Sequence, residues 1–218
     1  YGYPPDFRVD DGECGRIAGA RALAFLLERR EDPSLREVFA RLGFERAWKE
    51  LFADAAARLW TPSAAPDIPA MLRFQAEAVA RTIRSQAAII LDSARLAAEE
   101  AGAVPRNPSG KAAAVSSAFA ALPGNLGELG AAEAASAVSA VAAFNLSGFG
   151  RSDSDRRVKE AAAAARDAAR LLIKAADTEK LAPLAGSVLA LMAELGEQVR
   201  RAKRRARVMG FRDVAEAA

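Results

Sequence analysis

The residues with the clearest capacity for chemistry are cations near the end of the chain. The stretch 200–207 reads RRAKRRAR and carries six basic residues in eight positions. On a helix that turns about 100° per residue, one side presents Arg200, Lys203, Arg204 and Arg207. Such a strip can pair with the phosphates of a nucleic-acid backbone and release counterions. A solvated helix end is the alternative interpretation, because cations there also suit the negative end of the helix dipole.

Few other residue types could carry catalysis or bind a metal. The chain has no histidine and one cysteine, Cys14, which excludes an internal disulfide, Cys/His zinc sites and histidine-based triads. We expect Cys14 to be a small buried residue. The motif NPSGK at 107–111 is similar to the end of a phosphate-binding loop, but Pro105 replaces the required glycine and Ala112 the Ser or Thr. We therefore expect a polar loop there, no catalytic residue and no cofactor within this chain.

The composition favours an all-α protein. Hydrophobic residues make up 51% of the 218 residues, yet the mass of 22.9 kDa shows that many of them are alanine, the best helix former. No segment alternates with the period of two that is typical of a strand. The length allows a substantial core, and we expect a single helical domain over residues 1–218. From Gly150 onward 15 basic residues face 10 acidic ones, so the positive charge is C-terminal.

Hydrophobic spacings of three and four predict a multi-helix bundle with two long helices. One should run from Pro69 to about Gly102, and the other from about Thr178 to Val208 with Pro183 in its first turns. The helix before the last, over residues 155–177, should be capped by Asp155 or Ser154. Shorter helices are expected over residues 13–30, 33–42, 44–60, 112–122 and 131–146.

The chain shows neither a secretory signal nor an apolar run near the roughly 18 residues of a membrane span. We therefore expect no membrane partner and a cytoplasmic location. The chain opens without methionine, and we expect it to be part of a longer protein. The isolated chain is expected to be a monomer.

Two short motifs, one at each end, carry a resemblance to a known family. The chain opens with PPDFRVDDGE at 4–13, and RVMGFRD follows the basic stretch at 207–213. Together they resemble the UvrD/RecB-type superfamily 1 DNA helicases, especially the AddA and RecB helicase-nuclease branch, in which similar motifs flank an inserted helical subdomain called 1B. Gly210 departs from the aspartate usual in that family. The signature residues are Phe7, Arg8, Asp10, Phe211 and Asp213.

The resemblance implies a non-catalytic 1B-like subdomain of an ATP-dependent DNA helicase or helicase-nuclease that acts in double-strand-break repair or recombination. It implies weak, non-specific contact with the DNA backbone and with the remaining helicase domains. Residues 208–218 would be the return segment toward the ATPase core. ATP and Mg²⁺ would be bound by other parts of that parent enzyme.

A stand-alone Ala-rich interaction protein is the alternative hypothesis. The segment AAEAASAVSAVAA at 131–143 is rich in small residues, which permit close helix approach and could form a dimer interface.

Overall fold

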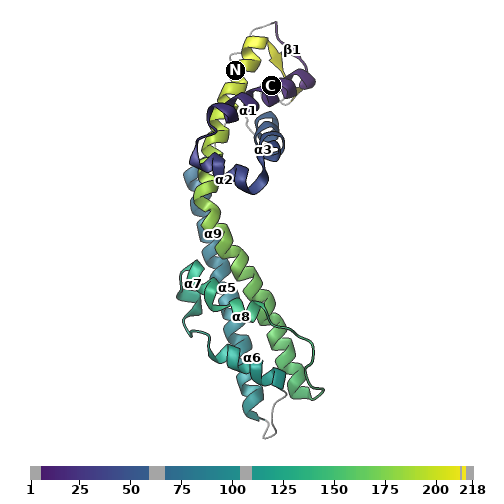
Figure 1. The fold of residues 1–218 in the computed structure, drawn as a ribbon, viewed down its shortest axis with the longest axis vertical. Coiled ribbons are helices and arrows are strands. Elements are labelled where there is room, and N and C mark those ends of the chain that lie inside the picture. Colours follow the sequence, from purple (N-terminus) through teal and green to yellow (C-terminus); the bar gives the residue numbers. More distant parts are fainter. Residues whose placement is uncertain (1–5, 59–66, 104–109, 212, 215–218) are drawn as a thin grey trace. The chain divides into compact units, whose positions relative to one another are not determined.

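A computed structural model describes residues 6–58, 67–103, 110–211 and 213–214. The described residues are helices joined by short connections, with one ladder of two short strands, so the predicted all-α class is confirmed (Figure 1). The chain forms two compact units. We call Tyr1–Leu72 together with Pro183–Ala218 the terminal unit, and Arg73–Ala182 the middle unit.

The terminal unit begins with strand β1 (Arg8–Val9) and helices α1 (Asp11–Glu28) and α2 (Pro33–Leu42). The Asp10 side chain caps α1 by accepting a hydrogen bond of 2.9 Å from the Glu13 amide. Asp32 caps α2 in the predicted way, with Pro33 at the first helical position. Gly43 then ends α2 at a φ of 80°, which glycine adopts without strain.

A third helical stretch follows, made of α3 (Phe44–Arg46), the π-helix η1 (Ala47–Ala53) and α4 (Asp54–Arg58). It matches the helix predicted from Phe44, although Trp60 lies outside the described residues. The Trp48 indole N–H donates a hydrogen bond of 3.0 Å to the Gly19 carbonyl, which ties η1 to α1. Such a bond satisfies the only polar atom of a half-buried tryptophan.

The core of the terminal unit lies between these short helices and the second half of α9 (Asp153–Ala206). Burial of each large side chain contributes roughly 1.5–3 kcal/mol. Close packing also explains Gly186, because a Cβ there would lie 2.9 Å from Leu72 Cδ1 on α5 (Ile68–Ala103). The largest fully buried side chains of this core are Phe25, Leu26, Leu35, Phe52, Leu195 and Val199.

The middle unit packs small helices against α5 and the first half of α9. They are α6 (Gly110–Ala120), the 3-10 helix η2 (Leu126–Glu128), α7 (Ala131–Ala137) and α8 (Ser139–Ala142). Four side chains of the 131–143 segment are buried in this core and do not form an exposed surface. They are Ala131, Ala134, Val138 and Val141.

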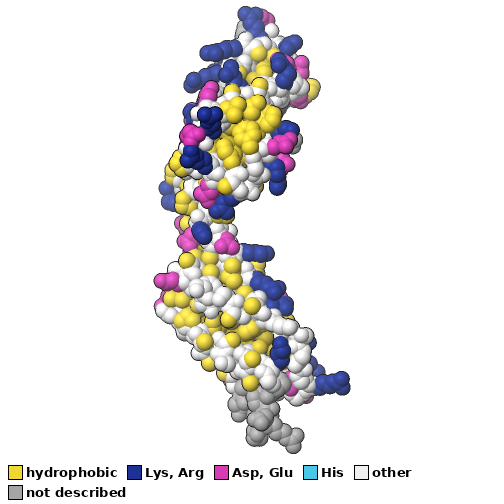
Figure 2. Space-filling view, in the orientation of Figure 1, with side chains coloured by type: hydrophobic (Ala, Val, Ile, Leu, Met, Phe, Trp, Pro, Cys, Tyr) yellow, Lys and Arg dark blue, Asp and Glu magenta, His cyan; other side chains and the backbone are white. Residues whose placement is uncertain are grey.

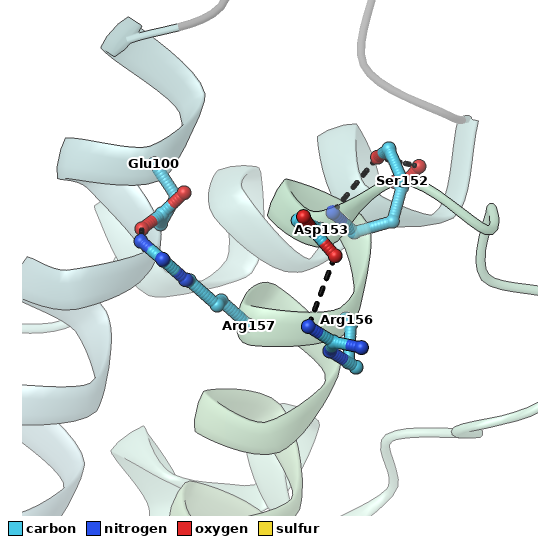
Figure 3. A network of polar contacts seen from close by, with 6 residues as sticks. Glu100, Ser152, Asp153, Arg156 and Arg157 are labelled. Atoms are coloured by element: carbon cyan, nitrogen blue, oxygen red, sulfur yellow. Dashed lines mark hydrogen bonds and ion pairs between the residues drawn. The ribbon is translucent and has the colours of Figure 1, made fainter.

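The start of α9 differs from the prediction, because Ser152 and not Ser154 or Asp155 caps it. The Asp155 amide donates to Ser152 Oγ at 3.1 Å, and Ser152 Oγ donates back to the Asp155 carboxylate at 2.7 Å. Asp155 is therefore the third residue of the helix, and both its amide and its carboxylate bind the hydroxyl of the capping serine. Arg157 then joins this end to α5 through a contact of 2.8 Å with Glu100 (Figure 3).

The two helices predicted over residues 155–177 and 178–208 are one continuous helix, so the predicted break was wrong. Residues 174–182 are mostly good helix formers without glycine, and nothing there terminates the helix. Pro183 lies inside α9 at the boundary of the two units, where it removes one backbone hydrogen bond.

Candidate functional site

The two ends of the described chain meet in the terminal unit. Strand β1 pairs in parallel with β2 (Val208–Met209), with Arg8 opposite Val208. The Arg8 amide donates to the Arg207 carbonyl at 2.9 Å, and the Asp10 amide donates to the Met209 carbonyl at 2.9 Å. We call residues 6–14, 203–211 and 213–214 together the junction. Its strands are too short for a sequence pattern to reveal.

Side chains reinforce the junction from both ends. Lys203 Nζ lies 2.8 Å from Asp213 Oδ2, and these side chains are only 8% and 14% exposed. The same oxygen accepts a hydrogen bond of 2.8 Å from the Gly210 amide. The Phe211 amide donates to Asp11 Oδ1 at 2.9 Å. The motifs singled out at the two ends of the sequence therefore lie in one hydrogen-bonded network.

Packing around position 210 favours glycine in this structure. A Cβ at this position would lie 2.7 Å from Asp11 Oδ1 and 3.8 Å from Cys14 Sγ. No side chain fits there without displacing Asp11. Cys14 is buried, as expected, and burial raises the pKa of its thiol, which keeps it protonated and unreactive.

The four cations predicted to form one phosphate-binding strip do not form one exposed row. Lys203 is buried, because it continues the apolar stripe of α9 at a spacing of four after Val199. Arg200 is mostly buried and pairs with Glu197. Arg207 is exposed, adopts a φ of 57° and pairs with Asp6. Arg204 is exposed.

The arginines that are left for an external partner lie beside the predicted strip. Arg201 and Arg205 on α9, and Arg21 on α1, are exposed and have no carboxylate partner among the described residues. Lys and Arg side chains project from several places on the terminal unit (Figure 2). The helical phase could have identified Arg201 and Arg205, since they lie opposite the stripe that ends at Lys203.

A groove of about 490 Å³ lies between α1 and the last turns of α9. It is open to solvent, and Arg16 and Arg21 of α1 and Arg205 of α9 line it. One further charge, Glu13, is bound by Arg16 through contacts of 2.9 and 2.6 Å. This hydrogen bonding lowers the pKa of the Glu13 carboxyl and raises that of Arg16. The remaining lining residues are Ile17, Ala20, Ala24, Ala202 and Ala206.

The described residues contain no group of three or more His, Cys, Asp or Glu that could hold a metal ion. Within the same ranges, every helix is too short or too polar to cross a membrane. Most of the NPSGK motif lies outside the described residues, and its last residue, Lys111, is in the first turn of α6.

The candidate residues that the structure brings together are thus the junction and the arginines beside it. A comparison of the chain with protein families, curated proteins and solved structures found no match.

Proposed function

We propose that the chain is a non-catalytic, 1B-like helical part of an ATP-dependent DNA helicase or helicase-nuclease, and that it helps to hold DNA during strand-break repair or recombination. The observation that carries this proposal is the junction. The two segments that resemble the flanks of the helicase insertion pair directly with each other, although about 200 residues separate them.

The junction suits an insertion for a topological reason. A helical subdomain can interrupt another fold without disturbing it when the points where the chain enters and leaves lie close together. Parallel pairing of β1 with β2 brings the two segments side by side. The buried contact between Lys203 and Asp213 holds the outgoing segment against the end of α9.

The exposed arginines support contact with DNA. A guanidinium keeps its charge at every physiological pH and matches a phosphate with two parallel N–H groups. Contacts of this kind position a protein on a nucleic acid without reading its sequence. ATP and Mg²⁺ would be bound by the remaining helicase domains. In a bacterial enzyme, work on chromosomal DNA would place the protein in the cytoplasm.

The test is binding of a fluorescently labelled forked duplex, followed by anisotropy over a range of salt concentrations. With three or four phosphates bound, the log–log slope of affinity against salt should be about −3. Two duplexes of unrelated sequence should bind equally. Replacing Arg201 and Arg205 by glutamine should bring the slope closer to zero by about 1 for each phosphate that the variant no longer neutralises.

The matched control is Arg36→Gln with Arg41→Gln on α2, which removes the same charge from two arginines that pair with glutamates. It should leave the slope unchanged. A wild-type chain that does not bind either duplex at low salt, or that binds with a salt-independent affinity, contradicts the proposed function.

A further inference from the structure

We propose that the groove between α1 and the end of α9 is the path of the phosphate backbone of a nucleic-acid duplex. This inference rests on the proposed function and adds where on the terminal unit the DNA lies. It assigns the main contacts to Arg21 and Arg205, which come from segments of the chain that are far apart in sequence.

The charges of the groove favour an anion. Three arginines and one glutamate line it, and the bidentate contact between Arg16 and Glu13 pairs two of these four charges. Arg21 and Arg205 remain without a carboxylate partner among the described residues. Two guanidinium groups on opposite walls therefore present positive charge to an anion that enters the groove.

The other lining residues indicate which part of a nucleic acid would enter. Four of them are alanines, whose small side chains let a sugar–phosphate chain come close to the helix backbones. None of the described lining residues is aromatic, so the groove offers no platform on which unpaired bases could stack. The bases of a duplex are already paired and stacked, so its phosphate backbone can bind without such a platform.

The open form of the groove favours a polymer over a small phosphorylated molecule. A small-ligand site usually covers most of its ligand's surface, whereas Arg16, Arg21 and Arg205 all lie exposed at this groove. A polymer can continue beyond the groove, and each further phosphate contact adds affinity through counterion release.

The junction fixes the two walls relative to each other. The Arg8 amide binds the Arg207 carbonyl directly after the last turn of α9, and Asp10 caps the first turn of α1. The backbones of the end of α9 and of the start of α1 are therefore held in place before DNA arrives. A preorganised site loses less conformational entropy on binding.

The experiment uses the full chain and the labelled duplex, with two variants that change the groove. Arg21→Gln with Arg205→Gln removes the two unpaired cations. Ala20→Glu places a carboxylate at an exposed lining position. Each variant should weaken duplex binding roughly tenfold or more at low salt, and the double variant should bring the salt slope closer to zero by about 2.

Matched controls make the same charge changes on α2. Arg36→Gln with Arg41→Gln, and Ala40→Glu at another exposed position, should bind like the wild type. Far-UV circular dichroism and thermal unfolding should show that all four variants keep the wild-type fold.

The results separate this inference from the proposed function. If the wild type binds the duplex with a steep salt dependence and both groove variants retain it, the groove is not the path of the duplex backbone. That result does not contradict the proposed function. A wild-type chain without duplex binding overturns both. An unlabelled single strand of equal length should compete less well than the duplex, and stronger competition by the single strand also contradicts the assigned path.

Discussion

Lys203 lies at the end of an apolar stripe, and its charge pairs with the largely buried carboxylate of Asp213. Met192, Leu195 and Val199 precede it on the buried side of α9 at spacings of three and four. A count of basic residues in the sequence cannot separate this lysine from its exposed neighbours, but the phase of the stripe can. Its partner Asp213 could not have been predicted, because it follows a turn that depends on packing at the other end of the chain.

We expect Lys203→Met to loosen the junction. The substitution leaves the Asp213 carboxylate largely buried without its cation, which should lower the free energy of unfolding by about 3 kcal/mol. Cys14, the only cysteine, lies beside Gly210 and reports on the same region. Burial is the main cause of the raised pKa of this thiol, and the Lys203 charge opposes it. Because exposure of Cys14 should outweigh the loss of that charge, its reaction with a thiol reagent in native buffer should become at least several-fold faster.

Urea unfolding and the rate of thiol labelling measure the two effects. Arg201→Gln removes an exposed cation from the same helix and should change neither quantity. Equal stability and equal labelling in Lys203→Met and the wild type would show that the buried ion pair does not hold the junction.

Glu13 gives a prediction for pH dependence. The hydrogen bond from Arg16 keeps the pKa of this carboxyl below its ordinary value of 4.5. A lowered folded-state pKa means that the stabilisation is fully present above about pH 4.5 and is lost as the pH falls through the folded-state value. An NMR titration should show the low pKa, and Arg16→Gln should bring it back toward 4.5. A Glu13 pKa that is the same in both proteins would contradict the observed contact.

At the scale of the elements, α2 was the most predictable helix. Its bounds follow from local chemistry, because Asp32 caps its start, Pro33 occupies its first position and Gly43 ends it. The structure confirms these predicted bounds. Ser152 was missed because Ser154 and Asp155 are also common caps, and only the hydrogen bonds distinguish them. The pairing of β1 with β2 depends on contacts across the whole chain, which local patterns do not contain.

Pro183 tests the continuity of α9. An interior proline costs a helix about 3 kcal/mol relative to alanine, while it stiffens the unfolded chain by up to about 1 kcal/mol. Pro183→Ala should therefore raise the free energy of unfolding by about 2 kcal/mol. Amide hydrogen exchange near residue 183 should slow as well. Urea unfolding and mass-detected exchange check these effects, and a less stable variant with faster exchange would contradict a helix that is continuous through this position.

At the scale of the whole molecule, the chain builds two cores, and α9 contributes buried residues to both. The apolar stripe of α5 predicted that helix, whereas α9 was predicted as two separate helices. The division at Leu72 and Pro183 arises because different short helices pack against the two halves of α9. The candidate site could be predicted only in part. The basic end of α9 was visible in the sequence, whereas Arg21 joins it only because α1 lies beside that end in the fold.

The most direct test of DNA contact by these arginines is a protection experiment on the wild-type chain. Phenylglyoxal modifies accessible arginines, and mass spectrometry measures the extent at each position with and without duplex DNA. We predict that the duplex protects Arg21, Arg201 and Arg205, and that Arg36 and Arg41 on α2 are modified equally in both samples. Equal modification of Arg21, Arg201 and Arg205 with and without a saturating duplex would contradict the claim that this face of the terminal unit holds DNA.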